Sequence, residues 1–206
     1  MKFPFEDKVD KSALFNRLQT EAHIWFFRTD VRLSDEQHAV YLSQLSVDEK
    51  QRYHRFHYEK DRKSYLVAHI LLRNALSKYV DVPIEAWQFA CNEHGKPEIT
   101  RTVDLPEMSF NITHTEGLCA CVITRGAASG IDAENVNRQS NYKGIAKRMF
   151  SADENAVFDV SKKQTQQFYK FWTLREAYVK ALGVGLSGSS KEFSFALDDN
   201  DECISI

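Results

Sequence analysis

The stretch QQFYKFWTLREAYVKAL, from Gln166 to Leu182, decides the fold expected for this chain. Aromatic and aliphatic residues recur in it every three or four positions, which predicts a long helix with a wide apolar face. Gly183 follows as the expected left-handed end of that helix. Glu176 and Lys180 are four positions apart and share one helical face, which indicates either a common surface ion pair or part of a reactive site.

The segments on either side of this helix predict an alternation of strands and helices. Capping-box matches at Ser46 (SVDE) and Ser151 (SADE) each predict the start of a helix, and a further helix is expected over residues 60–79. This order predicts an α+β fold of two similar halves, each a small antiparallel sheet packed with helices, with residues 1–126 in the first half and residues 127–206 in the second. The other expected elements are the strands HIWFFR, WQFAC, MSFNIT, LCACVIT, GIDAE and EFSFAL, the short helix IAKRMF, and a last strand from DDNDECISI.

The composition limits the classes of function. With 206 residues and 43% hydrophobic content the chain can bury a sizeable core, and a net charge of −2 gives no general reason to bind nucleic acid or an anionic membrane. No apolar run approaches the roughly 20 residues of a membrane span, and the charged N-terminus is unlike a signal peptide, so a cytoplasmic location is expected. The four cysteines lack paired spacing, and Cys119 and Cys121 are expected to pack in a buried strand.

The segment GIDAEN, from Gly130 to Asn135, carries two carboxylates two positions apart. On a strand, Asp132 and Glu134 share one face, where they repel each other unless a cation lies between them. A solvated strand end is the simpler interpretation. If Glu176 joins them, the three acids form the all-oxygen site that Mg²⁺ prefers when it also holds a substrate phosphate.

Three further segments offer groups that bind phosphate. HGKP, residues 94–97, is a Gly-containing turn with a lysine, and NITHTEG places Thr113 and His114 at the end of a strand. EKQRYHRFHYEKDRK, residues 49–63, interleaves basic side chains with aromatics, a combination that suits an adenine and its phosphates. A surface turn, a structural histidine and a solvated helix face are the respective simpler interpretations.

These motifs together resemble a known family. FNITHTEG, GIDAE, IAKRMFSADE and FWTLREAYVKALGVGL, in this order, resemble the signature series of the 4'-phosphopantetheinyl transferases, and most closely their long, two-half monomeric type, which includes the surfactin-synthetase-activating enzymes. HGKPEI and SVDEKQRYHRF match the family as well, so the resemblance covers about residues 46–197. It implies the family's pseudo-twofold fold and a monomer.

The resemblance implies transfer of the phosphopantetheine arm of coenzyme A to a serine of an apo acyl or peptidyl carrier protein, with release of adenosine 3',5'-bisphosphate. The family's metal acids map onto Asp132, Glu134 and Glu176, which would hold Mg²⁺, or Mn²⁺, against the pyrophosphate of coenzyme A. Glu176 is also the implied general base for the carrier serine, and Lys180 would stabilise or protonate the leaving phosphate.

The resemblance also assigns the groups that hold coenzyme A. Because carrier proteins present an acidic helix, a basic and apolar surface near the site is expected to receive it. The implied contacts are Thr113 and His114 with phosphate groups, Lys96 and Pro97 with the nucleotide end, and Arg52 and Arg55 with the 3'-phosphate.

Two departures from the family pattern affect these expectations. Arg175 stands where the family commonly has lysine, so a phosphate contact is expected to shift and coenzyme A affinity to change. The chain ends shortly after EFSFAL, so the second sheet is expected to be small, with an edge that favours self-association. Two rival functions remain at this stage: a non-catalytic relative that binds coenzyme A or a carrier protein, and a magnesium-dependent phosphohydrolase.

Overall fold

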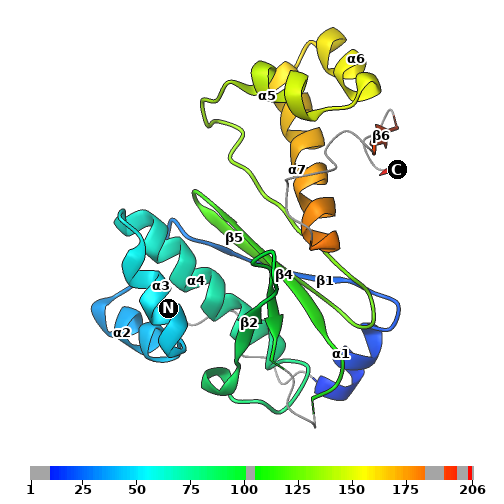
Figure 1. Cartoon of the computed structure of the whole chain (residues 1–206). Helices are drawn as coiled ribbons and strands as arrows, with labels where there is room; N and C mark the ends of the chain where they lie inside the picture. Colours follow the sequence, from blue (N-terminus) through cyan, green and yellow to red (C-terminus); the bar gives the residue numbers. More distant parts are fainter. Residues whose placement is uncertain (1–9, 101–104, 184–192, 199–203, 206) are drawn as a thin grey trace.

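The computed structural model describes residues 10–100, 105–183, 193–198 and 204–205. These residues form an α+β fold with small antiparallel sheets and seven α-helices (Figure 1). The helices are α1 (Lys11–Arg17), α2 (Asp35–Ser43), α3 (Val47–Arg55), α4 (Glu59–Leu76), α5 (Tyr142–Met149), α6 (Ala152–Val160) and α7 (Gln164–Leu182), with a 3₁₀ turn at Ile84–Ala86. The strands are β1 (His23–Arg28), β2 (Phe89–Cys91), β3 (Pro97–Ile99), β4 (Ser109–Thr115), β5 (Leu118–Thr124), β6 (Ala196–Leu197) and β7 (Ile204–Ser205).

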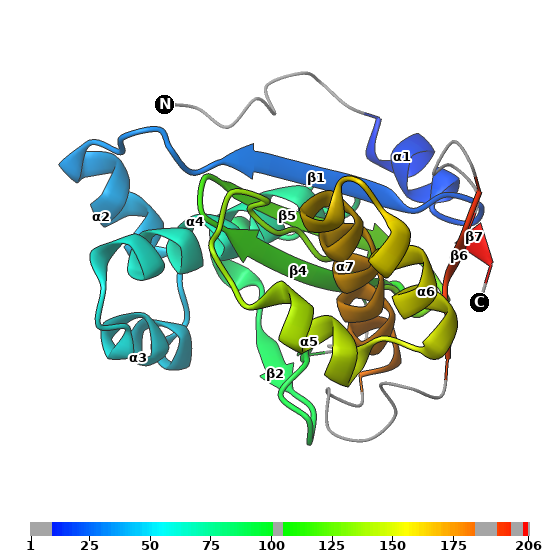
Figure 2. The ribbon, with the colours of Figure 1, turned by 90° about the horizontal axis from the view of Figure 1, so that it is seen from above.

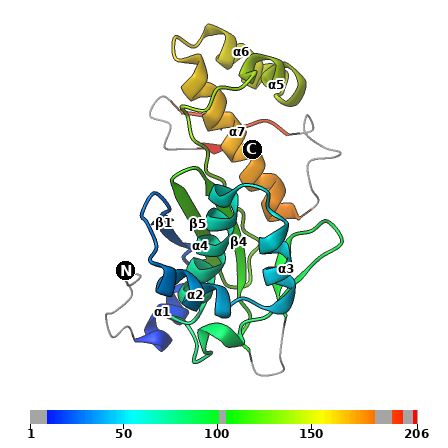
Figure 3. The same ribbon diagram turned by 90° about the vertical axis from the view of Figure 1, so that its left-hand side faces the viewer.

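The central sheet has the strand order β1-β5-β4, and both pairs are antiparallel. Helix α4 crosses one face of this sheet and contacts all three strands (Figure 3). Because side chains alternate along a strand, the β4 residues that face α4 are Phe110, Ile112 and His114, whereas Asn111 and Thr113 face the opposite side. That opposite side receives the segment that leads to the second half of the chain.

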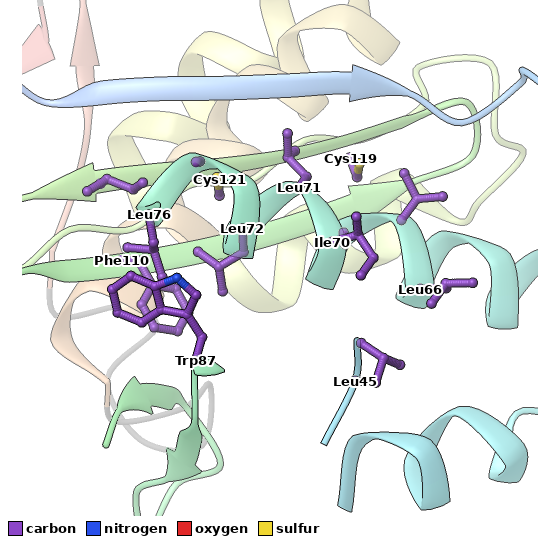
Figure 4. Packing of buried hydrophobic residues seen from close by; sticks show 14 of the residues in the cluster. Leu45, Leu66, Ile70, Leu71, Leu72, Leu76, Trp87, Phe110, Cys119 and Cys121 are labelled. Carbon is purple, nitrogen blue, oxygen red and sulfur yellow. The ribbon is translucent and has the colours of Figure 1, made fainter. Parts of the chain in front are cut away.

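The main hydrophobic core lies between α4 and the central sheet (Figure 4). Leu66, Ile70 and Leu72 of α4 are essentially inaccessible and pack toward Cys119 and Cys121 of β5, which are also inaccessible. Each such aliphatic side chain contributes about 1.5–3 kcal/mol through its removal from water. Both cysteines are free and buried, which confirms the packing role predicted for them.

A second, smaller core joins α5, α6 and α7. Helices α5 and α6 lie away from the central sheet, whereas α7 runs back to it (Figure 1). It consists largely of phenylalanine rings, with Phe168 stacked on Phe150 at a centroid distance of 5.5 Å and Phe171 edge-on to Phe150 at 5.6 Å. Phe158, Phe195, Ala146 and Tyr169 are also buried in this core. The apolar surface of α7, wider than one ordinary stripe, is thus used by two neighbouring helices and the strand segment that follows.

A buried carboxylate organises the start of α3. Glu49 completes the predicted capping box, because Ser46 N donates to its Oε2 at 2.8 Å. The same carboxylate pairs with His69 Nδ1 at 2.7 Å and with the guanidinium of Arg73, which lies 4.8 Å from the centre of the Phe89 ring. Burial alone would raise the pKa of Glu49, but these two partners lower it to about 2, so the carboxylate stays charged.

The same arrangement occurs at the start of α6. Ser151 N donates to Glu154 Oε2 at 2.9 Å, and Arg175 Nε of α7 donates to the same oxygen at 2.8 Å. The Arg175 guanidinium also lies 4.5 Å from the centre of the Phe193 ring and donates to the Phe193 carbonyl at 2.8 Å. Arg175 is 3% exposed and its guanidinium is held by Glu154 and Phe193, so its side chain is directed into the core and away from a phosphate.

Most of the predicted elements are confirmed, including both capping boxes and the left-handed Gly183, which has φ 72°. One is wrong: the GIDAE segment forms no regular element, because no neighbouring strand pairs with it among the described residues. The strand expected over EFSFAL is described from residue 193 and is regular only at β6, and the predicted last strand appears as β7. In the described ranges, no helix is long and apolar enough to cross a membrane.

Candidate active site

The Gly130–Asn135 segment is attached to β4 by side chains instead of a backbone ladder. Asn111 Oδ1 accepts from Ile131 N at 3.0 Å, and Thr113 Oγ1 accepts from Ala133 N at 3.3 Å. Thr113 also donates to Asp132 Oδ1 at 3.2 Å. Asn111 and Thr113 are both buried, so these partly buried bonds hold the segment against the face opposite α4.

Gly130 brings this segment into backbone contact with α7. A Cβ atom at position 130 would lie 1.8 Å from the Ala177 carbonyl oxygen and 2.6 Å from Ala181 N. No side chain fits at such distances, and the two facing residues of α7 are alanines. Glycine is therefore required here for close approach, and its φ is not in the left-handed region.

This close approach places Asp132 against Lys180. Lys180 Nζ lies 2.6 Å from Asp132 Oδ1 and donates to the Ile131 carbonyl at 3.2 Å. Figures 1 and 2 show the C-terminal end of α7 beside the central sheet, where this contact forms. The acid of GIDAE and the base of the long helix, predicted from separate motifs, are thus direct partners.

Glu176 lies one turn before Lys180 and within electrostatic reach of two other carboxylates. Its pKa is raised by burial and by the nearby charges of Asp132 and Glu134, and Lys180 only partly opposes this shift. Glu176 Oε1 and Asp132 Oδ2 are buried and have no hydrogen-bond partner among the described residues. Buried carboxylate oxygens without partners are costly, so this site has the chemistry of a cation-binding site.

The three acids do not form a closed ligand set by themselves. In the part of the chain that the structure describes, no three His, Cys, Asp or Glu side chains are close enough to hold a metal ion as placed. Glu134 lines a cavity of about 770 Å³ together with His114 and Arg138. The orphaned oxygens of Asp132 and Glu176 and the charge of Glu134 fit a hard divalent cation, which prefers such oxygen ligands.

His114 lies within electrostatic reach of this cluster. Although its side chain is exposed, its pKa is lowered because surrounding protein atoms displace water from the ring. The charges of His69 and Lys180 lower the pKa further. A weaker contribution from Arg52 shows that the C-terminal end of α3 lies within electrostatic reach of the cluster.

Arg52 and Arg55 line a hollow of their own. This hollow, of about 620 Å³, is formed by α3 and Phe56. The Arg52 guanidinium lies 5.9 Å from the centre of the Tyr65 ring, a cation–π contact that fixes its side chain. The predicted basic and aromatic combination is therefore present, at the edge of the site and not within it.

Lys96 and Pro97 line a third cavity, of about 390 Å³, at the C-terminal end of α7. Lys96 Nζ donates to the Ala181 carbonyl at 3.0 Å. Burial lowers the pKa of Lys96, which Glu98 partly opposes. The HGKP loop is thus adjacent to the C-terminal end of α7, one helical turn beyond Glu176.

The structure therefore brings together some predicted residues and separates others. Thr113, Asp132 and Lys180 are in contact, with Glu176, Glu134 and His114 within electrostatic reach. Sequence reasoning missed Asn111, which holds the Gly130–Asn135 segment, and the close contact made by Gly130. The alternation of β4 and the glycine of GIDAE were the signals available for them.

Comparison with known proteins identifies the family of the chain. A family model described as 4'-phosphopantetheinyl transferase superfamily matches residues 128–205, and one described as 4'-phosphopantetheinyl transferase, N-terminal, matches residues 32–125. The 4'-phosphopantetheinyl transferase Sfp of Bacillus subtilis is 31% identical over 175 residues, which are 84% of this chain and 75% of the relative. HetI of a Nostoc species, also a 4'-phosphopantetheinyl transferase, is 30% identical over 172 residues, which are 82% and 72% of the two chains.

The fold and the site thus define a protein with an acid and lysine cluster at the junction of an antiparallel sheet and a long helix. The chain belongs to the 4'-phosphopantetheinyl transferase superfamily.

Proposed function

We propose that this protein transfers the 4'-phosphopantetheine arm of coenzyme A to a serine of an apo acyl or peptidyl carrier protein and releases adenosine 3',5'-bisphosphate. Family membership supports the reaction and coenzyme A as co-substrate. The single observation that carries the proposal is the cluster of Asp132, Glu176 and Lys180, which joins the two family motifs in space.

The chain's own residues suit the chemistry assigned to them. Glu176 has a raised pKa, which makes it a stronger base than an ordinary glutamate, and it takes the proton from the carrier serine directly or through water. Lys180 stabilises the leaving phosphate by its charge, or donates a proton to it. Asp132 holds the Lys180 ammonium in place at 2.6 Å. Glu176 and Lys180 lie one helical turn apart, a spacing that suits two groups acting on one phosphate.

We assign Asp132, Glu134 and Glu176 to hold Mg²⁺, or Mn²⁺. The orphaned oxygens Asp132 Oδ2 and Glu176 Oε1 support this assignment. A bound divalent ion supplies positive charge that neutralises the pyrophosphate of coenzyme A.

The remaining assignments concern the rest of coenzyme A. We infer that Thr113 and His114 contact its phosphate groups, because Thr113 bonds Asp132 and His114 lies within electrostatic reach of Lys180. Arg52 and Arg55 are proposed for the 3'-phosphate, supported by the hollow that they line. Lys96 and Pro97 are proposed to lie near the nucleotide end, where they line a cavity of their own.

The two halves, residues 1–126 and 127–206, are proposed to be related by a pseudo-twofold axis. The repeated capping box, buried glutamate and helix arginine support this relation, since the sequence around Arg73, LRNALSK, corresponds to LREAYVK around Arg175. The boundary between the two matched family models supports the division. We further propose that the protein is cytoplasmic and monomeric. Size-exclusion chromatography with light scattering tests the second point by measuring the mass of the protein in solution.

Intact-protein mass spectrometry tests the proposed reaction. Several apo carrier proteins are incubated with the protein, coenzyme A and Mg²⁺, with a metal-free control. A metal-dependent mass gain of one phosphopantetheine on a carrier is expected, and the fastest carrier identifies the preferred class. Coenzyme A cleavage without a carrier would indicate a phosphohydrolase, and coenzyme A binding without any mass gain would indicate a non-catalytic relative.

Two variants test the assigned roles. Glu176→Gln removes the base while preserving shape, so transfer is expected to fall by at least about 100-fold with an unchanged melting temperature. Asp132→Ala is expected to weaken magnesium-dependent coenzyme A binding, measured by calorimetry with and without the metal. Near-normal turnover of Glu176→Gln would remove Glu176 from the mechanism, and unchanged magnesium dependence of Asp132→Ala would count against the metal assignment.

A further inference from the structure

The C-terminal end of α7 receives a cation from the first half of the chain. The last carbonyl groups of a helix lack intrahelical partners and carry the negative end of its dipole. Gly183 N satisfies the Val179 carbonyl at 3.0 Å, and Lys96 Nζ satisfies the Ala181 carbonyl at 3.0 Å. The ammonium of Lys96 thus acts as a C-terminal cap supplied by a residue 85 positions earlier in the chain.

The hairpin that carries Lys96 is held rigidly. Asn92 Oδ1 accepts from His94 N at 3.0 Å and from Lys96 N at 2.9 Å, and Asn92 N donates to the Lys96 carbonyl at 2.9 Å. Gly95 takes a φ of 82°, which closes the turn. A Cβ at Gly183 would lie 3.3 Å from Lys96 Cδ and 3.4 Å from the Asn92 side chain, so the turn packs directly on the helix end.

The same turn of α7 is also fixed on another side. A Cβ atom at position 130 would lie only 2.6 Å from the backbone nitrogen of Ala181, so Gly130 contacts this residue. Lys96 binds the carbonyl of Ala181. Lys180, immediately before Ala181, makes the contact with Asp132, and Glu176 lies one turn earlier. Any movement of the Ala181 turn therefore moves both groups assigned to the reaction.

We propose that Lys96 is a positioning residue that anchors the C-terminal turn of α7 to the first half and so sets the placement of Glu176 and Lys180. The catalytic consequence rests on the proposed transferase function, whereas the anchoring contact itself does not. Lys96 then acts through the helix and not through a contact with the nucleotide.

The test compares Lys96→Met, which removes the cation, with Lys96→Arg, which keeps it. Lys162→Met serves as the matched control, because Lys162 is an exposed lysine in the turn between α6 and α7. Hydrogen exchange of backbone amides in α7 is followed by mass spectrometry, and kcat and KM for coenzyme A are measured separately. Binding of adenosine 3',5'-bisphosphate is measured by calorimetry.

The expected result is faster exchange in the last turns of α7 in Lys96→Met, a fall in kcat of about tenfold, and restoration of both by Lys96→Arg. Binding of adenosine 3',5'-bisphosphate should stay close to that of the wild type, and Lys162→Met should change nothing. Unchanged exchange in α7, with weaker bisphosphate binding or a raised KM alone, would overturn the proposal and leave Lys96 as a nucleotide contact. Because the exchange measurement needs no turnover, failure of wild-type transfer would defeat the proposed function while leaving the anchor tested.

Discussion

At the scale of single residues, the site depends on one place where two backbones touch. Gly130 faces Ala177 and Ala181, and these small residues let the backbone of the GIDAE segment contact the backbone of α7. Asp132 lies two positions after Gly130, and Lys180 directly precedes Ala181. These two side chains are then close enough to pair at 2.6 Å. Small residues therefore set the distance at which the charged ones act.

Gly130→Ala tests this contact. The added methyl group must push the segment away from the Ala177 carbonyl, because a Cβ would lie 1.8 Å from it. Overpacking of this kind costs about 1–3 kcal/mol, and a displacement of about 1 Å at a reactive group costs about 100-fold in rate. Both the free energy of unfolding, from urea titration, and the transfer rate should fall.

Gly144→Ala is the matched control for that variant. Its added Cβ meets the side chain of Asn141, the N-cap of α5, and the loss of about 1 kcal/mol from a weakened cap is offset by the better helix propensity of alanine. We expect nearly normal stability and transfer. If Gly130→Ala behaved like this control, the close contact would not determine the site.

At the scale of elements, the same pairing of a capping glutamate with an arginine occurs twice in the chain. Glu49 and Glu154 each close a capping box and each receive an arginine from the long helix that follows, Arg73 and Arg175. The pair fixes the angle between the short helix and the long one, because one carboxylate satisfies groups on both. Arg175 thus orients α7 from inside the core, while Glu176 beside it faces the site.

Arg175→Lys tests the structural role of that arginine. Lysine keeps the charge but loses the fork that bonds Glu154 and the Phe193 carbonyl together, which should lower the free energy of unfolding by roughly 1–3 kcal/mol. The KM for coenzyme A should not change, because Arg175 is buried. A changed KM with an unaltered free energy of unfolding would indicate that Arg175 does contact a phosphate of coenzyme A.

At the scale of the whole molecule, two separate cores are joined through a narrow set of polar contacts. The α4 core and the phenylalanine core have different members, and the bonds between them include Asn111 with Ile131, Thr113 with Asp132, and Lys96 with Ala181. The proposed site lies at this junction, so the way the two parts are joined is part of its chemistry.

Asn111→Leu tests the junction. The part-buried N–H of Ile131 would lose its partner, at a cost of about 1 kcal/mol. We expect weaker coupling between the two cores, seen as a broadened or two-step urea transition, together with slower transfer.

Asn74→Leu provides the comparison for Asn111→Leu. Asn74 bonds only within α4, to the Ile70 carbonyl, as far as the described contacts show. It should keep one sharp transition and normal transfer. Equal behaviour of the two variants would mean that Asn111 does not link the cores.

The sequence by itself determined the elements and the chemical groups. Both capping boxes, the long helix with its Gly183 end and the strands of the central sheet follow from short-range patterns, because caps and periodicity act over a few residues. The acids of GIDAE and α7 were also identified from their motifs.

Only the tertiary structure decided how these groups meet. GIDAE was expected as a strand because it alternates, but its backbone groups bond to side chains of β4, a choice that depends on a distant neighbour. Likewise, a phosphate contact was considered at the position of Arg175, but the fold pairs the Arg175 guanidinium with Glu154. Local sequence fixes which groups are available, whereas contacts between residues far apart in the chain fix which of them share a site, since those contacts depend on packing that no short segment encodes.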